Sequence, residues 1–289
     1  MVVPMGSFVY RMRLRQVRFC SRWICRLSNI RFCRSLVGWA HRTPIARQAV
    51  RFAIGFRGPF ATLAEAMAAI RGLEGSGHSN PNYRDVHLAL AEKTQPSDYP
   101  ALFHVRSVLP QIRRVFDVGG SIGNVFYCYA RYLDFPTDLT WTVHDLPQAL
   151  RMGEELARVR DEGRLRFAEQ LAEADGTDLL LATGSLHYFD RPLPELIAGF
   201  VTRPRYILIN RTPLTDGPTC ATVQDGGAWL LACMLYNRDQ LVQGLEALDY
   251  EIIDSWQVPE ASVIIPGYPE QSAPAYSGLF LRRRALKVS

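Results

Sequence analysis

The stretch that most constrains the fold of this chain is VFDVGGSIGNVFY, residues 115–127. A short apolar run contains an acid, Asp117, and glycines follow before an apolar and aromatic run resumes. This order predicts a buried strand, a tight turn and the start of a helix. Glycine lacks a Cβ, so such a turn can adopt a positive φ and its backbone can approach a ligand closely. An ordinary strand–helix turn shows the same pattern, so the rest of the chain must decide its role.

The length and composition limit the classes of protein that this chain can belong to. Its 289 residues are 48% hydrophobic, which suits one large domain or two small ones. No run of 18 apolar residues is present, so no membrane-spanning helix is expected. The six cysteines form no C-x-x-C pair and no cluster with histidine, which argues against a metal site. Without a secretory segment, the chain is expected to be cytoplasmic with reduced thiols.

The positive charge is concentrated in one arm of the chain. Residues 1–58 contain twelve arginines and no acid, whereas the remainder holds 21 basic and all 28 acidic side chains, a net charge of −7. Residues 1–57 are therefore expected to form a separate basic arm. Arginine is mixed with large apolar side chains over residues 8–57, and Arg11, Arg15, Arg18, Arg22 and Arg26 fall near helical spacing, which is compatible with an amphipathic helix on an anionic membrane surface.

Other interpretations of this arm remain open. A nucleic-acid-binding patch is a less favoured one. A poorly ordered extension, an upstream start codon without a selected function and an organellar transit peptide would all have a similar composition.

Residues 58–112 are expected to form a helical cap. A turn is expected at Gly55–Pro59, and Thr62 followed by Glu65 is a capping-box pattern at the start of a helix. Two further helices are expected, at Tyr83–Lys93 and Tyr99–Ile112.

Strands and helices are expected to alternate over residues 113–289. The seven expected strands are Val115–Val118, Leu139–Val143, Leu165–Ala168, Asp178–Ala182, Tyr206–Ile209, Tyr250–Trp256 and Tyr276–Arg282. One expected helix follows the first strand and ends near Tyr132, and three others span Pro147–Arg160, Pro192–Val201 and Gly226–Tyr236. Asn237 or Asp239 is expected to cap a further helix that ends near Leu248. This alternation predicts an α/β fold with a doubly wound, mostly parallel seven-stranded sheet. The last strand follows a long loop rather than a helix, so an antiparallel insertion is expected.

Polar residues collect where four of these strands end. They are Asp117 with the glycines, His144–Asp145, Thr183–His187 and Asn210–Arg211. Because ligands of open α/β sheets bind beyond the carboxyl ends of the strands, these residues predict a single site. Asp145 can accept hydrogen bonds from both hydroxyls of an adenosine ribose, which suits NAD and S-adenosylmethionine equally.

Motifs that are missing narrow this choice. The glycine order is D-x-G-G-x-x-G rather than G-x-G-x-x-G. Neither lysine, Lys93 or Lys287, lies four residues after a tyrosine, which removes the usual proton relay of short-chain dehydrogenases. The absence of G-x-x-x-x-G-K-[ST] argues against a nucleoside triphosphatase.

Four segments in order, VFDVGGSIG, WTVHDLP, LLLATGSLHYF and YILINRTP, resemble the motifs of class I S-adenosylmethionine-dependent methyltransferases. More narrowly, the chain is similar to a family of uncharacterised bacterial methyltransferases with a D-x-G-G-S-x-G loop and an N-R-T-P strand end. Here these family segments are GPFATLAEA at 58–66, NRTP at 210–213 and TVQ at 222–224. The resemblance covers about Gly55–Arg283.

The resemblance implies that S-adenosyl-L-methionine is the cofactor and assigns residues to it. The residues expected around its methionine and ribose are Asp117, Gly119, Gly120, Ser121 and Gly123, with Asp145 on the ribose hydroxyls, Leu146 beside the adenine, and Ser185 in the loop Thr183–Leu186 that closes over it. Ser121 departs from the usual G-x-G-x-G loop, so a hydroxyl contact would replace some of the backbone approach.

The expected reaction is O-methylation of a small-molecule or glycan acceptor by direct displacement at the sulfonium methyl. By resemblance, His187 occupies the place of the catalytic base in small-molecule O-methyltransferases, and its pKa range suits that role. A packed, pocket-lining histidine is the alternative. Asn210, Arg211 and Gln224 are candidate acceptor contacts, or hydrogen-bonding residues behind the site.

Two other classes stay open on the sequence: an NAD(P)-dependent oxidoreductase and a non-catalytic α/β binding protein. Nucleic acid is not the expected partner, and the oligomeric state cannot be derived from the sequence.

Overall fold

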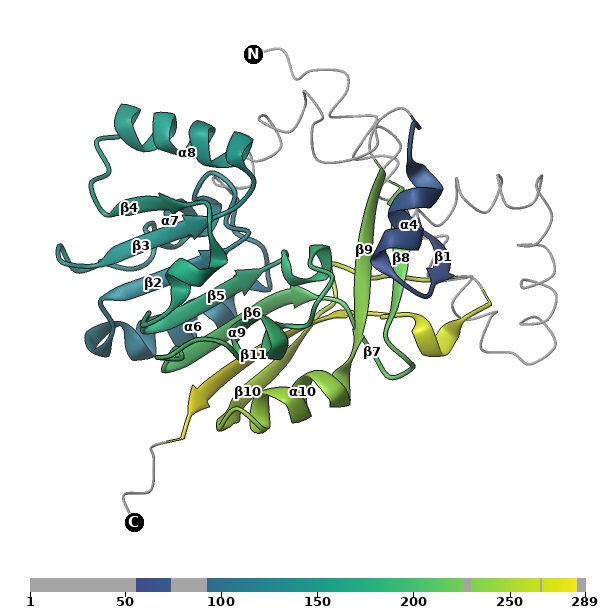
Figure 1. Cartoon of the computed structure of the whole chain (residues 1–289). Coiled ribbons are helices and arrows are strands. Elements are labelled where there is room, and N and C mark those ends of the chain that lie inside the picture. Colours follow the sequence, from purple (N-terminus) through teal and green to yellow (C-terminus); the bar gives the residue numbers. More distant parts are fainter. Residues whose placement is uncertain (1–55, 74–92, 226–229, 266, 285–289) are drawn as a thin grey trace. The chain divides into compact units, whose positions relative to one another are not determined.

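The computed structural model describes residues 56–73, 93–225, 230–265 and 267–284. The chain divides into two compact units, shown in Figure 1. The larger unit takes its described residues from Pro81–Leu214, Arg238–Ala261 and Ala275–Ser289, and the smaller from Met1–Asn80, Thr215–Asn237 and Ser262–Pro274. Nearly all of the basic arm and of the helix expected at Tyr83–Lys93 lies outside the described residues.

A seven-stranded sheet of order β10-β11-β6-β5-β2-β3-β4 forms the centre of the larger unit. Its strands are β2 (Arg114–Val118), β3 (Thr140–His144), β4 (Leu165–Ala168), β5 (Leu179–Thr183), β6 (Tyr206–Thr212), β10 (Tyr250–Val258) and β11 (Tyr276–Arg283). The strands from β2 to β6 pair in parallel, and β11 runs antiparallel to both β6 and β10. The structure thus confirms the predicted α/β class, the mostly parallel sheet and the antiparallel last strand.

The helices of the larger unit are α6 (Asp98–Val108), α7 (Asn124–Tyr129), α8 (Pro147–Val159), α9 (Leu193–Ile197) and α10 (Arg238–Glu246), with 3-10 turns η1 (Leu109–Gln111), η2 (Leu171–Ala174) and η3 (Leu186–Tyr188). α8 begins at Pro147. Proline lacks an N–H, but an N–H at the first position of a helix has no partner within the helix, so no hydrogen bond is lost. Four successive residues of β5, 179–182, are buried. Because side chains alternate between the faces of a strand, both faces of the sheet are covered there.

The smaller unit contains a four-stranded sheet of order β1-β8-β9-β7. Its strands are β1 (Phe56–Phe60), β7 (Leu214–Thr215), β8 (Cys220–Asp225) and β9 (Leu230–Asn237), and α4 (Leu63–Ile70) packs on β8 and β9. α4 has the predicted cap, since Thr62 Oγ1 accepts from the Glu65 N–H at 3.2 Å. The Glu65 carboxylate reaches back to the Ala61 N–H rather than to that of Thr62.

Two secondary-structure predictions in this unit are wrong. The turn expected at Gly55–Pro59 is the strand β1, and its glycine and proline fall where the pairing with β8 shifts register. The helix expected at Gly226–Tyr236 is replaced, over its described part, by β9. The run LLACMLY is apolar throughout, so its periodicity cannot separate a buried helix from a buried strand, and pairing with β8 decides.

The expected cap at residues 58–112 does not coincide with a compact unit. Its helix α4 belongs to the smaller unit, whereas α6 belongs to the larger one and packs on β6 and β11. Among the described residues, no helix is both long enough and apolar enough to cross a bilayer.

Candidate functional site

The chain turns sharply after β2 and holds a strained residue there. Gly119, Ser121 and Gly123 have φ angles of 70°, 57° and 89°. Glycine adopts such angles readily, whereas a residue with a Cβ is destabilised there by on the order of 1 kcal/mol. Strain of this kind at Ser121 is typical of turns that a function requires.

Close packing holds this turn against the neighbouring strand ends. The N–H groups of Gly119 and Gly120 donate to the carbonyl of His144 at the end of β3, at 2.7 and 3.3 Å. A Cβ on Gly119 would lie 2.3 Å from the Cβ of Ser185, and one on Gly120 would lie 2.5 Å from Oδ2 of Asp117. Both positions therefore require glycine.

Asp145 follows β3, and backbone N–H groups fix its carboxylate. Oδ2 accepts from the N–H of Ser121 at 2.8 Å, and Oδ1 accepts from the N–H of Leu146 at 2.7 Å. Two backbone N–H groups thus hold this carboxylate in place. The acid after β3 and the glycine turn after β2 are thus in direct contact. The Leu146 side chain beside them is half exposed.

Asp117 is fully buried beneath the turn. Its Oδ2 accepts a 3.3 Å hydrogen bond from Nε1 of Trp141, and its Oδ1 has no hydrogen-bond partner among the described residues. Burial raises the pKa of Asp117 from 3.8 to about 7; the Trp141 hydrogen bond opposes this shift, the charge of Asp145 adds to it, and that of Arg211 opposes it. At neutral pH the carboxyl group is therefore divided between its charged and uncharged forms.

The loop after β5 is tied to the strands on both sides. Ser185 Oγ donates to the carbonyl of Val118 on β2. The N–H of Gly184 donates to the carbonyl of Asn210 on β6 at 2.8 Å. These bonds bring Ser185 to the same side of the sheet as the glycine turn.

His187 lies in η3, directly after this loop, and only 4% of it is exposed. Its ring centre is 4.2 Å from that of Tyr188 and 5.9 Å from that of Tyr276, and it meets the Tyr276 ring edge to face. This surrounding fits a packed histidine, and it also fits a base in a water-poor site.

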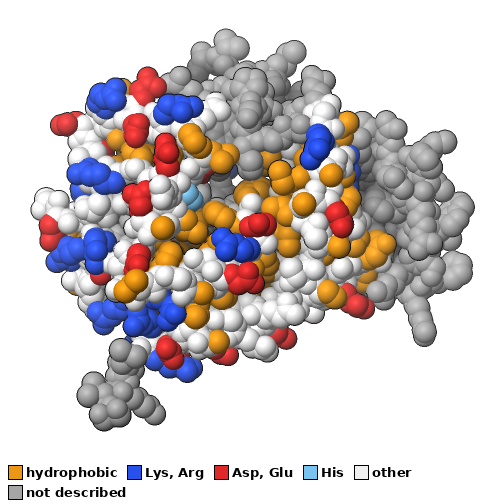
Figure 2. Space-filling model, in the orientation of Figure 1, with side chains coloured by type: hydrophobic (Ala, Val, Ile, Leu, Met, Phe, Trp, Pro, Cys, Tyr) orange, Lys and Arg blue, Asp and Glu red, His pale blue; other side chains and the backbone are white. Residues whose placement is uncertain are grey.

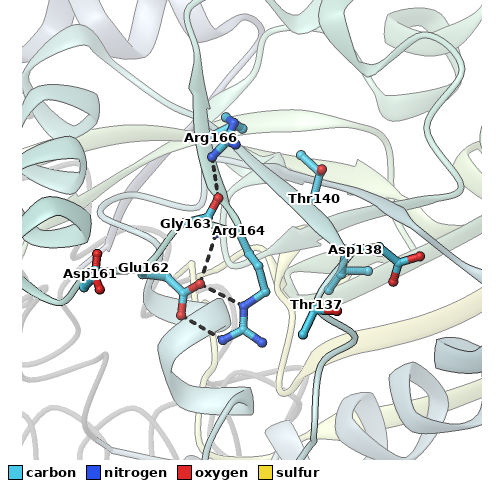
Figure 3. Close-up of a pocket in the computed structure, with 9 residues that line it drawn as sticks. Thr137, Asp138, Thr140, Asp161, Glu162, Gly163, Arg164 and Arg166 are labelled. Atoms are coloured by element: carbon cyan, nitrogen blue, oxygen red, sulfur yellow. Dashed lines mark hydrogen bonds and ion pairs between the residues drawn. The ribbon is translucent and has the colours of Figure 1, made fainter.

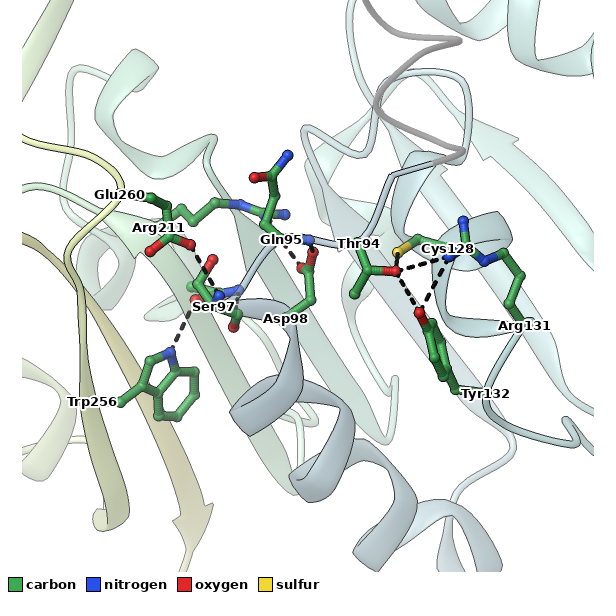
Figure 4. A network of polar contacts seen from close by, with 11 residues as sticks. Thr94, Gln95, Ser97, Asp98, Cys128, Arg131, Tyr132, Arg211, Trp256 and Glu260 are labelled. Carbon is green, nitrogen blue, oxygen red and sulfur yellow. Dashed lines mark hydrogen bonds and ion pairs between the residues drawn. The ribbon is translucent and has the colours of Figure 1, made fainter. Parts of the chain in front are cut away.

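Asn210 and Arg211, at the end of β6, belong to a polar network (Figure 4). Nδ2 of the buried Asn210 donates to the carbonyl of Ser97 at 3.0 Å, and its Oδ1 accepts from Nε1 of Trp256 at 3.1 Å. The guanidinium of Arg211, a residue with a φ of 53°, pairs with the buried Asp98 at 3.0 Å. Asn210 and Arg211, both predicted to contact the acceptor, thus bond to other residues of this chain, and no sequence motif predicts these bonds.

Gln224 is the predicted site residue that the larger unit does not contain. It lies on β8 of the smaller unit, where its strand partners are Phe56 and Leu231. Its role as an acceptor contact stays a prediction.

A hollow lies at the amino ends of the strands of the seven-stranded sheet, where β3 and β4 begin (Figure 3). Its lining residues are Thr137, Asp138, Leu139, Thr140, Asp161, Glu162, Gly163, Arg164 and Arg166. Arg164 donates twice to the Glu162 carboxylate at 2.8 Å, which lowers the pKa of Glu162. The hollow contains none of the predicted site residues.

Charges of both signs are interspersed over the visible face of the described chain (Figure 2).

Comparison with family models finds no match, and no curated protein matches the sequence. Several solved structures are similar. One is 1,6-didemethyltoxoflavin-N1-methyltransferase of Burkholderia thailandensis with bound 1,6-didemethyltoxoflavin and S-adenosylhomocysteine, at 21% identity over 79% of this chain and 93% of that chain, with a TM-score of 0.50.

Two others have lower TM-scores. They are an S-adenosylmethionine-dependent methyltransferase of Clostridium acetobutylicum (9% identity, 71% of this chain, 100% of that chain, TM-score 0.46) and magnesium protoporphyrin IX methyltransferase of Synechocystis with bound S-adenosylhomocysteine (13% identity, 72% and 97%, TM-score 0.45). At these identities the comparison shows the fold alone. The chain has the Rossmann-like fold of the methyltransferases.

Proposed function

We propose that this protein is an S-adenosylmethionine-dependent methyltransferase. The observation that supports this best is the 2.8 Å hydrogen bond between the Ser121 N–H and the Asp145 carboxylate. It joins the glycine turn after β2 to the acid after β3 on the carboxyl side of a methyltransferase-type sheet, where ligands of such sheets bind.

The residues at this place fit the chemistry of the donor. The ribose of adenosine offers two hydroxyl donors, and an ionised carboxylate such as that of Asp145, which backbone N–H groups hold in place, acts only as an acceptor. The donor is positively charged, and the buried Asp117 holds an oxygen without a hydrogen-bond partner among the described residues. Leu146 presents an exposed apolar side chain for contact with the adenine ring.

When bound, the donor supplies a methyl group that its positive sulfur already activates. The residues of this chain would fix its orientation and exclude water. We further propose a hydroxyl of a small molecule or glycan as the acceptor and His187 as the base that takes its proton. The position of His187 directly after the Ser185 loop supports this role.

Calorimetry with the full chain tests the proposed function. We expect S-adenosylhomocysteine to bind and NADH to give no heat of binding. Binding of NADH alone would instead support an oxidoreductase, and binding of neither would support a non-catalytic protein. A methyl-transfer screen should then include phenols, sugars and lipid-linked glycans. It should also include ring nitrogens, because the similar Burkholderia structure is that of an N1-methyltransferase.

A further inference from the structure

Asp117 has surroundings that are unusual for a carboxylate. It is fully buried, and its neighbours on the adjacent strands are the apolar Val143 and Leu181. Gly120 packs so closely on the carboxyl group that a Cβ there would lie 2.5 Å from Oδ2, and Trp141 Nε1 donates a hydrogen bond of 3.3 Å to the same oxygen. No lysine, arginine or histidine of the described chain forms an ion pair with it within 4.0 Å. A charged carboxylate here is therefore nearly uncompensated.

The charged and titratable groups that act on Asp117 do not compensate a negative charge on its carboxyl group. Asp145, after β3, has the same charge and disfavours ionisation. Arg211, at the end of β6, favours it, but its guanidinium is paired with Asp98. Tyr129, on α7, is fully buried, and burial raises the pKa of its phenol well above the usual value, so it stays neutral.

We propose that Asp117 holds a proton in the free protein and releases it to solvent when the positively charged methyl donor binds. This inference rests on the proposed function. One proton leaves and the positive charge of the donor takes its place, so that no other reactant is needed. The donor would thereby compensate a carboxylate that has no ion pair with any cation of the residues that the structure describes.

The exchange makes donor affinity depend on pH. The pKa of Asp117 in the free protein is about 7. Below that pH the donor must displace the proton, so affinity should fall by nearly tenfold for each unit of pH, and above about pH 8 it should level off.

The number of protons released can be measured directly. Calorimetric titration with S-adenosylmethionine at pH 7.0, in buffers of different ionisation enthalpy, gives this number for wild type and for Asp117→Asn. Subtracting the variant removes the titration of the donor's own amino group, which lies near pH 8. We expect wild type to release about half a proton more than the variant at pH 7, because its carboxyl is then half protonated. Asp138→Asn, an exposed residue where β3 begins, should release as many protons as wild type.

Donor binding without excess proton release at pH 7 would overturn the inference alone, whereas no donor binding at any pH would overturn the proposed function with it. If Asp117→Asn does not fold, the carboxyl-carbon NMR signal of Asp117 in the free wild-type protein replaces the subtraction. Titration of that signal near pH 7 supports the inference, and titration below about pH 5, near the ordinary range of aspartate, refutes it.

Discussion

The amino and carboxyl ends of the strands in the seven-stranded sheet, called here its amino side and carboxyl side, differ in how their charged residues are buried and paired. On the amino side, where β3 and β4 begin, Arg164 pairs with Glu162 at 2.8 Å and Arg113 pairs with Asp138 at 2.6 Å, all in contact with solvent. On the carboxyl side, Asp117 is fully buried without a cationic partner in the described chain.

This difference supports the proposed ligand site at the carboxyl ends of the strands. The hollow lies at the amino ends of the strands, but two of its charged lining residues, Arg164 and Glu162, already pair with each other. The carboxyl side retains positive φ angles at Ser121 and Arg211 and buried oxygens of Asp117 and Thr183 without hydrogen-bond partners among the described residues. Such costs are typical of functional sites, because a bound ligand can offset them.

The largest expected effect is on the pH dependence of the free energy of unfolding, which should change for a substitution on the carboxyl side but not for one on the amino side. The raised pKa of Asp117 means that the folded protein binds a proton that the unfolded chain lacks between about pH 4 and 7. The contribution of Asp117 to the free energy of unfolding should therefore fall as pH rises through that range. The free energy of unfolding of Asp117→Asn, relative to wild type, should rise by up to about 4 kcal/mol from pH 4 to pH 8. Denaturant unfolding at each pH measures this. Asp138→Asn on the amino side should show no comparable trend, and a flat profile for Asp117→Asn would contradict the comparison.

A pair of glycine substitutions tests packing on the two sides. Gly119→Ala would place a Cβ 2.3 Å from Ser185 at a φ of 70°, so we expect a loss of about 3 kcal/mol in the free energy of unfolding. Gly163→Ala, at the hollow, meets nothing within 4 Å and should change stability by less than about 1 kcal/mol. Equal effects of the two substitutions would remove the contrast.

His187→Ala tests whether the carboxyl side also holds the general base of the proposed methyl transfer. We expect turnover to fall by about 100-fold, roughly 2.7 kcal/mol, because a general base contributes at least that much. The affinity for S-adenosylhomocysteine, measured by calorimetry, should stay unchanged. Unchanged turnover would place the base elsewhere or show that the acceptor needs none.

The smallest expected effect concerns Asp145. Asp145→Ala should weaken S-adenosylhomocysteine binding at least about tenfold, or 1.4 kcal/mol, because the ribose hydroxyls lose their acceptor. Asp138→Ala, at the other end of the same strand, should leave affinity within about twofold of wild type. Calorimetry measures both, and equal affinity for Asp145→Ala and wild type would count against the assigned site.

Local patterns were enough to predict much of the larger unit. The strands from β2 to β6 and the antiparallel β11 were expected within a few residues, because apolar runs, turn residues and helix starts are encoded side by side. The closeness of the glycine turn to Asp145 was also expected, since the carboxyl ends of parallel strands meet at one edge of a sheet, but the hydrogen bond from the Ser121 N–H to Asp145 was not. The strand β9 was missed because a uniformly apolar run carries no period.

The sequence by itself determined that a glycine turn and an acid would end neighbouring strands of an α/β sheet. Only the tertiary structure decided that Asn210 bonds to Ser97 and Arg211 pairs with Asp98, each 113 residues away in the chain. It also decided that Asp117 is buried and has no ion pair with a cation of the described chain, and burial raises its pKa. The reason is physical: turn and strand preferences act between near neighbours, whereas burial and charge compensation depend on which distant segments the fold brings together.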